Sequence, residues 1–257
     1  MCGVLGGATR DGLVPEPREV EAALGLIAHR GPDAQGLCFG PNWFLGHRRL
    51  SIVDLDPRAN QPMRRGKLLI TFNGEIYNFR ELRRELEQRG HAFATTSDTE
   101  VLLSAYAEYG PACLDRIEGM FAFAIFDEER RTLFLARDRF GEKPLFYFND
   151  GRSFLFCSEV PPLEALLPAS RLEEAPEAIG LYFLYSYIPA PHAPYRNMRQ
   201  LEPGTWLEFD VAHWTERTGR YFDLRAEAAS VQATPSYGDA VEALRHSLGQ
   251  SVKLRLS

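Results

Sequence analysis

The second residue of the chain, Cys2, could act as a catalytic nucleophile. Met1 followed by a small residue is the usual substrate for removal of the initiator methionine, which would leave Cys2 with a free α-amino group. An α-amine has a reference pKa of about 7.7–8.0 and a thiol one of about 8.5. The neutral amine can accept the thiol proton and later return it to a leaving ammonia, so no histidine base is required. A single cysteine is weak evidence on its own.

Two neighbouring residues, Asn73 and Gly74, could stabilise the negative oxygen that forms when a thiolate attacks an amide. They offer a side-chain amide and a backbone N–H, and loss of one such donor typically costs about 10²–10³ in rate. Taken singly, an Asn-Gly pair is more often only a turn. An oxyanion site is therefore predicted here only in combination with the other groups.

An amino-acid substrate such as glutamine presents an α-carboxylate and an α-ammonium, and the sequence offers partners for both. Arg49 supplies a planar guanidinium that matches a carboxylate. Glu75 and Asp98 supply carboxylates for the ammonium. Asp98 alone is more often a helix-cap residue, so the case depends on the full set.

A mixture of strands and helices must position these side chains. The β-rich run 67–72 predicts a strand that ends in a turn at Asn73-Gly74. Ser97-Asp98-Thr99-Glu100 predicts a capping box at the start of a helix that Gly110 ends. Other predicted strands are 3–7, 37–39, 43–45, 120–126, 132–136, 145–148, 154–157 and 205–209, and other predicted helices are 19–28, 78–89 and 176–187. Helices between β-rich blocks indicate a layered α+β fold.

Composition narrows the class of protein. The 257 residues carry a net charge of -6 without a block of like charges, so nothing favours nucleic acid or a membrane surface as partner. No apolar run approaches the length of a membrane span and no signal peptide is visible, which makes the cytoplasm the expected location. The four cysteines form no C-x-x-C pair, so no metal site is predicted.

Together these segments resemble the glutaminase domain of glutamine-dependent asparagine synthetases, over essentially the whole chain. The motifs that carry the resemblance are Cys2-Gly3-Val4, His29 to Asp33, Arg49 to Asp54, Asn73 to Asn78, Ser97 to Glu100, Gly119 to Phe123, Ala136 to Gly141, Lys143 to Leu145 and Ser158-Glu159. Their number and order make the resemblance specific, whereas each motif alone is not.

The resemblance implies an N-terminal-nucleophile hydrolase fold, a four-layer αββα sandwich. It also implies that Cys2 forms a γ-glutamyl thioester and that Asn73 and Gly74 form the oxyanion hole. The substrate-binding residues that it implies are Arg49, Leu50, Ile52, Val53, Glu75 and Asp98.

The resemblance also predicts the domain organisation. Residues 2–210 are expected to be the class II glutamine amidotransferase domain, 211–237 a polar linker and 238–257 the start of a truncated synthetase domain. The amphipathic pattern of 239–256 predicts a helix whose apolar face nothing later in the sequence covers.

In the asparagine synthetases that the chain resembles, ammonia passes to a second domain in which ATP and Mg²⁺ activate aspartate. The Ser-Gly-Gly-x-Asp-Ser phosphate loop of that domain does not occur in this sequence. The chain is therefore expected to hydrolyse L-glutamine at most, without a cofactor of its own, and to deliver ammonia to a synthetase domain or its equivalent. The sequence leaves open whether the chain forms a homodimer. It also leaves two alternative functions: supply of ammonia to a different acceptor, as in polysaccharide or natural-product amidotransferases, or an inactive glutamine-binding module.

Overall fold

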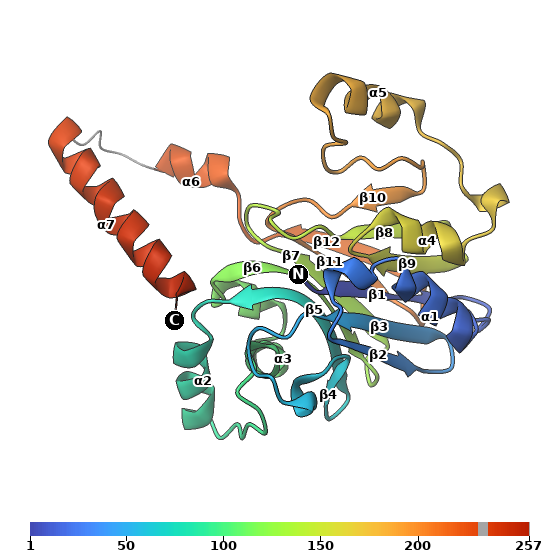
Figure 1. Ribbon diagram of the computed structural model, residues 1–257, viewed down its shortest axis with the longest axis horizontal. Coiled ribbons are helices and arrows are strands. Elements are labelled where there is room, and N and C mark those ends of the chain that lie inside the picture. Colours follow the sequence, from blue (N-terminus) through green and yellow to red (C-terminus); the bar gives the residue numbers. More distant parts are fainter. Residues whose placement is uncertain (231–235, 257) are drawn as a thin grey trace.

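The computed structural model describes residues 1–230 and 236–256, where two six-stranded antiparallel sheets dominate (Figure 1). The first sheet has the strand order β10-β8-β9-β1-β3-β2 and the second β12-β11-β7-β6-β5-β4. The strands of the first sheet are β1 (Gly3–Thr9), β2 (Ala34–Phe39), β3 (Trp43–Arg49), β8 (Phe146–Asn149), β9 (Ser153–Cys157) and β10 (Met198–Gln200). Those of the second are β4 (Met63–Arg65), β5 (Leu68–Ile76), β6 (Gly119–Asp127), β7 (Thr132–Arg137), β11 (Thr205–Asp210) and β12 (Thr215–Arg220).

Helices cover the outer faces of both sheets. α1 (Pro17–Gly25) and α4 (Val160–Leu166) pack on the first sheet, and α2 (Phe79–Gln88) and α3 (Asp98–Tyr109) on the second. A third apolar cluster lies between the sheets. The predicted four-layer αββα sandwich is therefore confirmed. The remaining helices are α5 (Pro176–Tyr185), α6 (Leu224–Ser230), α7 (Tyr237–Arg255) and the 3₁₀ turns η1 (Ala28–Arg30), η2 (Pro57–Ala59), η3 (Gly110–Asp115) and η4 (Ala169–Arg171).

β1 shows how the layers fix the amino terminus. Successive strand residues point to opposite faces, and accordingly Val4 packs between the sheets while Leu5 packs under α1 and α4. Both faces of β1 are covered, and its whole length is buried. Burial of β1 in the middle of the first sheet places Cys2, the residue before the strand, at a fixed point on the sheet edge.

Two local predictions differ from the structure. Asn73-Gly74 is not a turn, because β5 continues through both residues to Ile76, paired with β6. Ser97 does cap α3, since its Oγ accepts the Thr99 N–H at 3.1 Å. Glu100 does not complete the capping box but accepts the backbone N–H groups of residues 94 and 95. At Asn73-Gly74 pairing with a distant strand replaces the predicted turn, and at Glu100 the preceding loop replaces the predicted partner.

The segment predicted to be a linker, 211–237, is partly structured. β12 extends the second sheet by pairing with β11 along its whole length, and α6 follows it. The sequence pattern did not indicate β12 because its residues are polar and mostly exposed. Residues 231–235 of that segment lie outside the described residues, and the domain limits remain a prediction.

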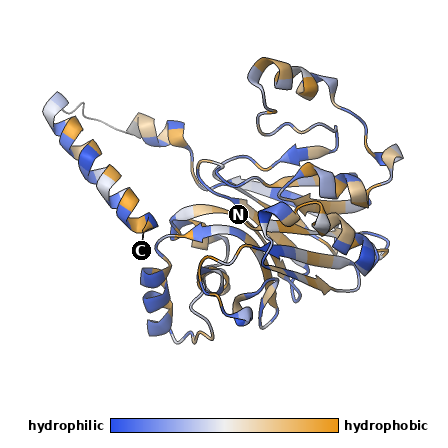
Figure 2. Cartoon of the chain, viewed as in Figure 1, coloured by the Kyte–Doolittle hydropathy of each residue, from blue (hydrophilic) through white to orange (hydrophobic). Residues whose placement is uncertain are grey.

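α7 lies beside the sandwich rather than within it, and its carboxyl-terminal end approaches the sandwich, as Figure 1 shows. Its helical span agrees with the prediction for 239–256. Apolar residues alternate with hydrophilic ones along it, as the colouring of Figure 2 shows. None of the described helices has both the length and the apolar character that crossing a membrane requires.

Candidate active site

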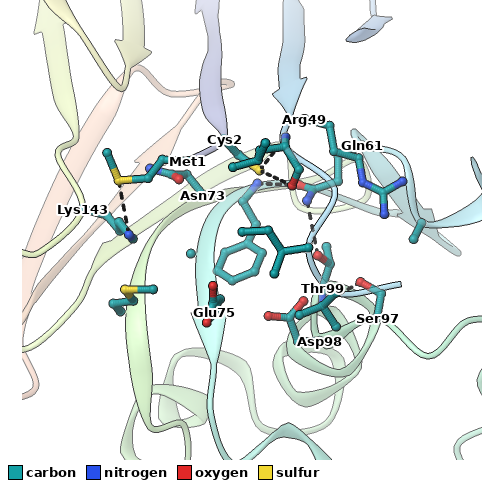
Figure 3. Close-up of a pocket in the computed structure, with 17 residues that line it drawn as sticks. Met1, Cys2, Arg49, Gln61, Asn73, Glu75, Ser97, Asp98, Thr99 and Lys143 are labelled. Atoms are coloured by element: carbon teal, nitrogen blue, oxygen red, sulfur yellow. Dashed lines mark hydrogen bonds between the residues drawn. The ribbon is translucent and has the colours of Figure 1, made fainter. Parts of the chain in front are cut away.

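A cavity of about 90 Å³ collects all nine residues that the sequence singled out (Figure 3). They come from four parts of the chain: the amino terminus, the end of β3 with the loop after it, β5, and the first residue of α3. The nine residues are Cys2, Arg49, Leu50, Ile52, Val53, Asn73, Gly74, Glu75 and Asp98. The pairing of β1 with β3 and the stacking of the two sheets bring these residues together, although they lie far apart in the sequence.

The thiol of Cys2 is held by backbone groups. The Leu50 N–H donates to Sγ at 3.4 Å, and Sγ lies 3.6 Å from the Leu50 carbonyl oxygen. Arg30 Nε donates to the Cys2 carbonyl at 3.0 Å, which fixes the backbone as well. Burial raises the pKa of the Cys2 thiol, while the Leu50 N–H, the amino terminus and Arg49 oppose the rise. A thiol with a raised pKa needs a nearby base to become a thiolate.

Asn73 presents an unused donor to this cavity. Its side chain is 1 % exposed, and its Nδ2 has no hydrogen-bond acceptor among the described residues. A buried N–H without a partner typically costs about 1–3 kcal/mol. Such a donor is poised to bind an oxygen that enters the cavity.

The backbone N–H of Gly74 points to the same edge. N–H groups along a strand alternate between its two sides. On β5 the N–H of Phe72 donates to Gln61 Oε1 at 2.6 Å, and that of Ile76 donates to Asp98 Oδ2 at 3.1 Å. Gly74 lies between them, so its N–H faces the cavity side of β5. Only glycine fits there, since a Cβ would lie 2.2 Å from the Met120 carbonyl oxygen.

Arg49 lies at the other end of the cavity and binds the loop that follows β3. Its Nη1 donates to Asn60 Oδ1 at 2.6 Å and to the Asp56 carbonyl at 3.1 Å, and its Nη2 donates to the Asp54 carbonyl. These three bonds use three of the five guanidinium N–H groups. Arg49 therefore shapes the loop and still has donors for an anion.

Two carboxylates, Glu75 on β5 and Asp98 on α3, line the same cavity. Burial raises the pKa of Asp98 to about 6, and repulsion from Glu75 adds to the rise, whereas the N–H groups of Ile76 and Thr99 oppose it. A cation placed between the two carboxylates would relieve their repulsion. The pair therefore suits an ammonium group.

The loop after β3 supplies a wall that contains Ile52 and Val53. Asp33 accepts the Ser51 N–H at 2.7 Å, and Asp54 accepts the Thr96 N–H at 2.7 Å, so both ends of the wall are tied. Ile52 itself is 62 % exposed and forms the rim rather than the floor.

Eight further residues line the cavity without a catalytic or binding role assigned from the sequence: Met1, Ala59, Gln61, Phe72, Ser97, Thr99, Met120 and Lys143. Gln61 joins β5 to α3, because its Nε2 donates to Thr99 Oγ1 at 3.2 Å while its Oε1 accepts from β5. Nothing in its local sequence indicates this role. Lys143 belongs to a motif that the sequence did single out, and its rarity as one of three lysines was a usable signal.

The four-layer sandwich with a cysteine at the head of a central strand defines the class of N-terminal-nucleophile glutamine amidotransferases. Solved structures support the fold. Glutamine phosphoribosylpyrophosphate amidotransferase from Bacillus subtilis superposes with a TM-score of 0.63 at 22% identity, over 86% of this chain and 49% of that one.

Sequence comparison identifies the family: residues 1–222 match the glutamine amidotransferase domain, and the chain belongs to that family. Asparagine synthetase [glutamine-hydrolyzing] 3 of Bacillus subtilis is 34% identical over all of this chain and 41% of its own length. Amidase chry2 of Gibberella zeae is 37% identical over all of this chain and 39% of its own length. The chain thus spans about two fifths of the length of these relatives.

Proposed function

We propose that this chain hydrolyses L-glutamine to glutamate and ammonia through a thioester on Cys2. The observation that carries the proposal is the pair of N–H donors on β5, Asn73 Nδ2 and Gly74 N, that face the cavity containing the Cys2 thiol. Two aimed donors beside a nucleophile are what the tetrahedral intermediate of acyl transfer requires.

The proposed reaction has two halves. The neutral α-amine of Cys2 takes the thiol proton, and the thiolate attacks the side-chain carbonyl carbon of glutamine. The resulting oxyanion accepts hydrogen bonds from Asn73 and Gly74, and the amine proton passes to the leaving nitrogen, which departs as ammonia. Water, activated by the same amine, then cleaves the thioester and releases glutamate.

The substrate's other end is assigned to the opposite side of the cavity. Arg49 binds the α-carboxylate with its remaining donors, while Glu75 and Asp98 bind the α-ammonium. Backbone groups at Leu50, Ile52 and Val53 line the path between the two ends.

The names of the relatives support an assignment of the ammonia acceptor. We propose that the chain is the ammonia-supplying part of an asparagine synthetase, whose further residues bind ATP and Mg²⁺ and amidate aspartate. The alternative of another acceptor has a specific observation in its favour, since one relative of similar identity has the name amidase rather than asparagine synthetase. Both assignments leave the chemistry at Cys2 unchanged.

The experiment is a glutamate-release assay on wild type, Cys2→Ala, Asn73→Ala and the matched control Cys38→Ala. Cys38 is a free cysteine outside the cavity, so its variant should keep wild-type turnover. Cys2→Ala should release no glutamate above background. Asn73→Ala should lose about 10²–10³ in kcat, because one oxyanion donor is missing.

Intact mass supplies two further readouts. The active enzyme should lack Met1, and a glutamine-analogue electrophile should add once to wild type and Cys38→Ala but not to Cys2→Ala. Turnover that survives Cys2→Ala would overturn the proposed mechanism.

A further inference from the structure

Lys143 is a buried cation in the cavity that the proposed reaction does not yet use. The chain has only three lysines among 29 basic residues. The residue is 6 % exposed and lies on the loop between β7 and β8. Its N–H donates to Asp138 Oδ2 at 3.0 Å, and its carbonyl accepts from Arg137 Nε at 2.8 Å. The backbone of Lys143 is therefore held on both sides, so its side chain enters the cavity from a fixed position.

The ammonium group of Lys143 has no carboxylate partner within ion-pair distance among the described residues. Its hydrogen-bond contact is Met1 Sδ, at 3.4 Å. A thioether is a weak acceptor, and a buried cation without compensation is costly. Figure 3 shows Met1 between Lys143 and Cys2. Removal of Met1 takes away this contact and creates a new amino group on Cys2 in the same cavity.

We infer that Lys143 is a positioning residue for proton transfer: its ammonium faces the new α-amine of Cys2 and favours the neutral form of that amine. The inference rests on the proposed function. An ordinary α-amine is largely protonated at neutral pH and cannot then accept the thiol proton. A second cation in a desolvated site disfavours protonation, and this is a known route to a reactive amine.

The other charged groups around Cys2 are either paired or directed elsewhere. Arg30 reaches the Cys2 carbonyl, but its charge is balanced by Glu159, to which Nη1 donates at 2.8 Å. Arg49 lies toward the loop after β3, where the substrate carboxylate is assigned. The thiol of Cys2 itself stays neutral until it transfers its proton, because burial raises its pKa.

Glu75 and Asp98 are the two groups that act against Lys143, because anions favour a protonated amine. In the proposed complex the α-ammonium of glutamine pairs with them and Arg49 pairs with the α-carboxylate. Lys143 is then the cation in the cavity without a counter-charge. Its influence should therefore be greatest in the substrate complex, which kcat reports.

The experiment measures kcat for glutamate release from pH 5.5 to 9.5, at saturating glutamine, in wild type, Lys143→Met, Lys143→Arg and the control Lys67→Met. Lys67 is exposed and lies outside the cavity. In Lys143→Met the acidic limb of the profile should move up by about one pH unit, so that kcat falls about tenfold at pH 6.5 and approaches wild type at pH 9. Lys143→Arg and Lys67→Met should keep the wild-type limb.

A second experiment measures the protonation of the Cys2 α-amine without enzyme turnover. Of the two protonation states of an amine, cyanate carbamoylates only the neutral one, and peptide mapping reports how the rate at the Cys2 amine, as distinct from the thiol, depends on pH. In wild type the half-maximal rate should fall below pH 7.7, the lower end of the ordinary range for an α-amine of about 7.7–8.0. This test needs no variant to fold.

The outcomes separate the inference from the proposed function. A loss in Lys143→Met that is constant across pH, or a Cys2 amine that titrates in the ordinary range or above it, overturns the inference while glutamate release by wild type stands. If wild type releases no glutamate, or if the release does not depend on Cys2, the proposed function itself is overturned.

Discussion

Helices α3 and α7 have the same kind of N-terminal cap, but α3 is buried and α7 is exposed. Each begins after a serine whose side chain accepts a backbone N–H, Ser97 for α3 and Ser236 for α7. In α3 every residue from Asp98 to Tyr106 is buried, whereas along α7 no residue is. Capping and helical period therefore specify that a helix forms, and they leave open what the helix packs against.

The difference extends to polar residues. α3 buries Glu100 because the N–H groups of residues 94 and 95 satisfy its carboxylate, and its first residue, Asp98, reaches into the cavity. α7 touches the sandwich near its end, where Arg255 lies 4.4 Å from the ring centroid of Tyr77. One helix is thus a supporting wall of the candidate active site, and the other meets the sandwich near its last turn.

The largest expected effect is on α3. Leu102 is 0 % exposed and packs in the cluster between α3 and the second sheet. Replacing it with alanine removes buried methyl groups and leaves a cavity, which should lower the free energy of unfolding by about 2–5 kcal/mol. Urea denaturation followed by circular dichroism measures the change. A loss below about 1 kcal/mol would mean that α3 is less firmly packed than its burial indicates.

A smaller effect concerns the functional end of α3. The pKa of Asp98, raised by burial to about 6, leaves its carboxyl group ionised at pH 7.5 and protonated below pH 6. If it binds the substrate ammonium, the KM for glutamine should rise about tenfold per pH unit below pH 6. Asp98→Asn should raise KM about 10–100-fold at pH 7.5, as expected for loss of a charged hydrogen bond, and should show a much weaker pH dependence.

Stability provides the control for Asp98→Asn. A carboxyl group whose pKa is higher in the folded state contributes stability that is fully present below its unfolded pKa and is lost as pH rises through about 6. At pH 7.5 the ionised group therefore opposes folding, and Asp98→Asn should be as stable as wild type or more so. A variant that loses both stability and affinity would indicate a structural rather than a binding role.

Apolar periodicity in the sequence predicted a layered α+β fold, and the family resemblance carried by the ordered motifs implied the αββα sandwich. The nine residues assigned to the site line one cavity, although nothing in the structure tests their roles. The sequence missed features that depend on a neighbour in space. β12 is a polar edge strand, so it carries no apolar alternation. Asn73-Gly74 has turn composition, but pairing with β6 keeps both residues in a strand.

The role of Lys143 could not be derived for the same reason. Its motif was visible in the sequence, but its entry into the cavity depends on Asp138 and Arg137, which hold its backbone. Gln61 likewise acquires its partners only when β5 and α3 come together. Motifs in the sequence therefore singled out residues that line the cavity, while the residues that support them required the structure.

The smallest expected effect completes the comparison of the two helices. Leu248 on α7 is 61 % exposed, so Leu248→Ala removes little buried surface. The free energy of unfolding should change by no more than about 0.5 kcal/mol, against the several kcal/mol expected for the same substitution at Leu102. Urea denaturation of both variants at two protein concentrations tests the contrast. A loss above about 1 kcal/mol in Leu248→Ala would show that the apolar face of α7 is covered in solution, and if that loss grew with protein concentration, the cover would be a second copy of the chain.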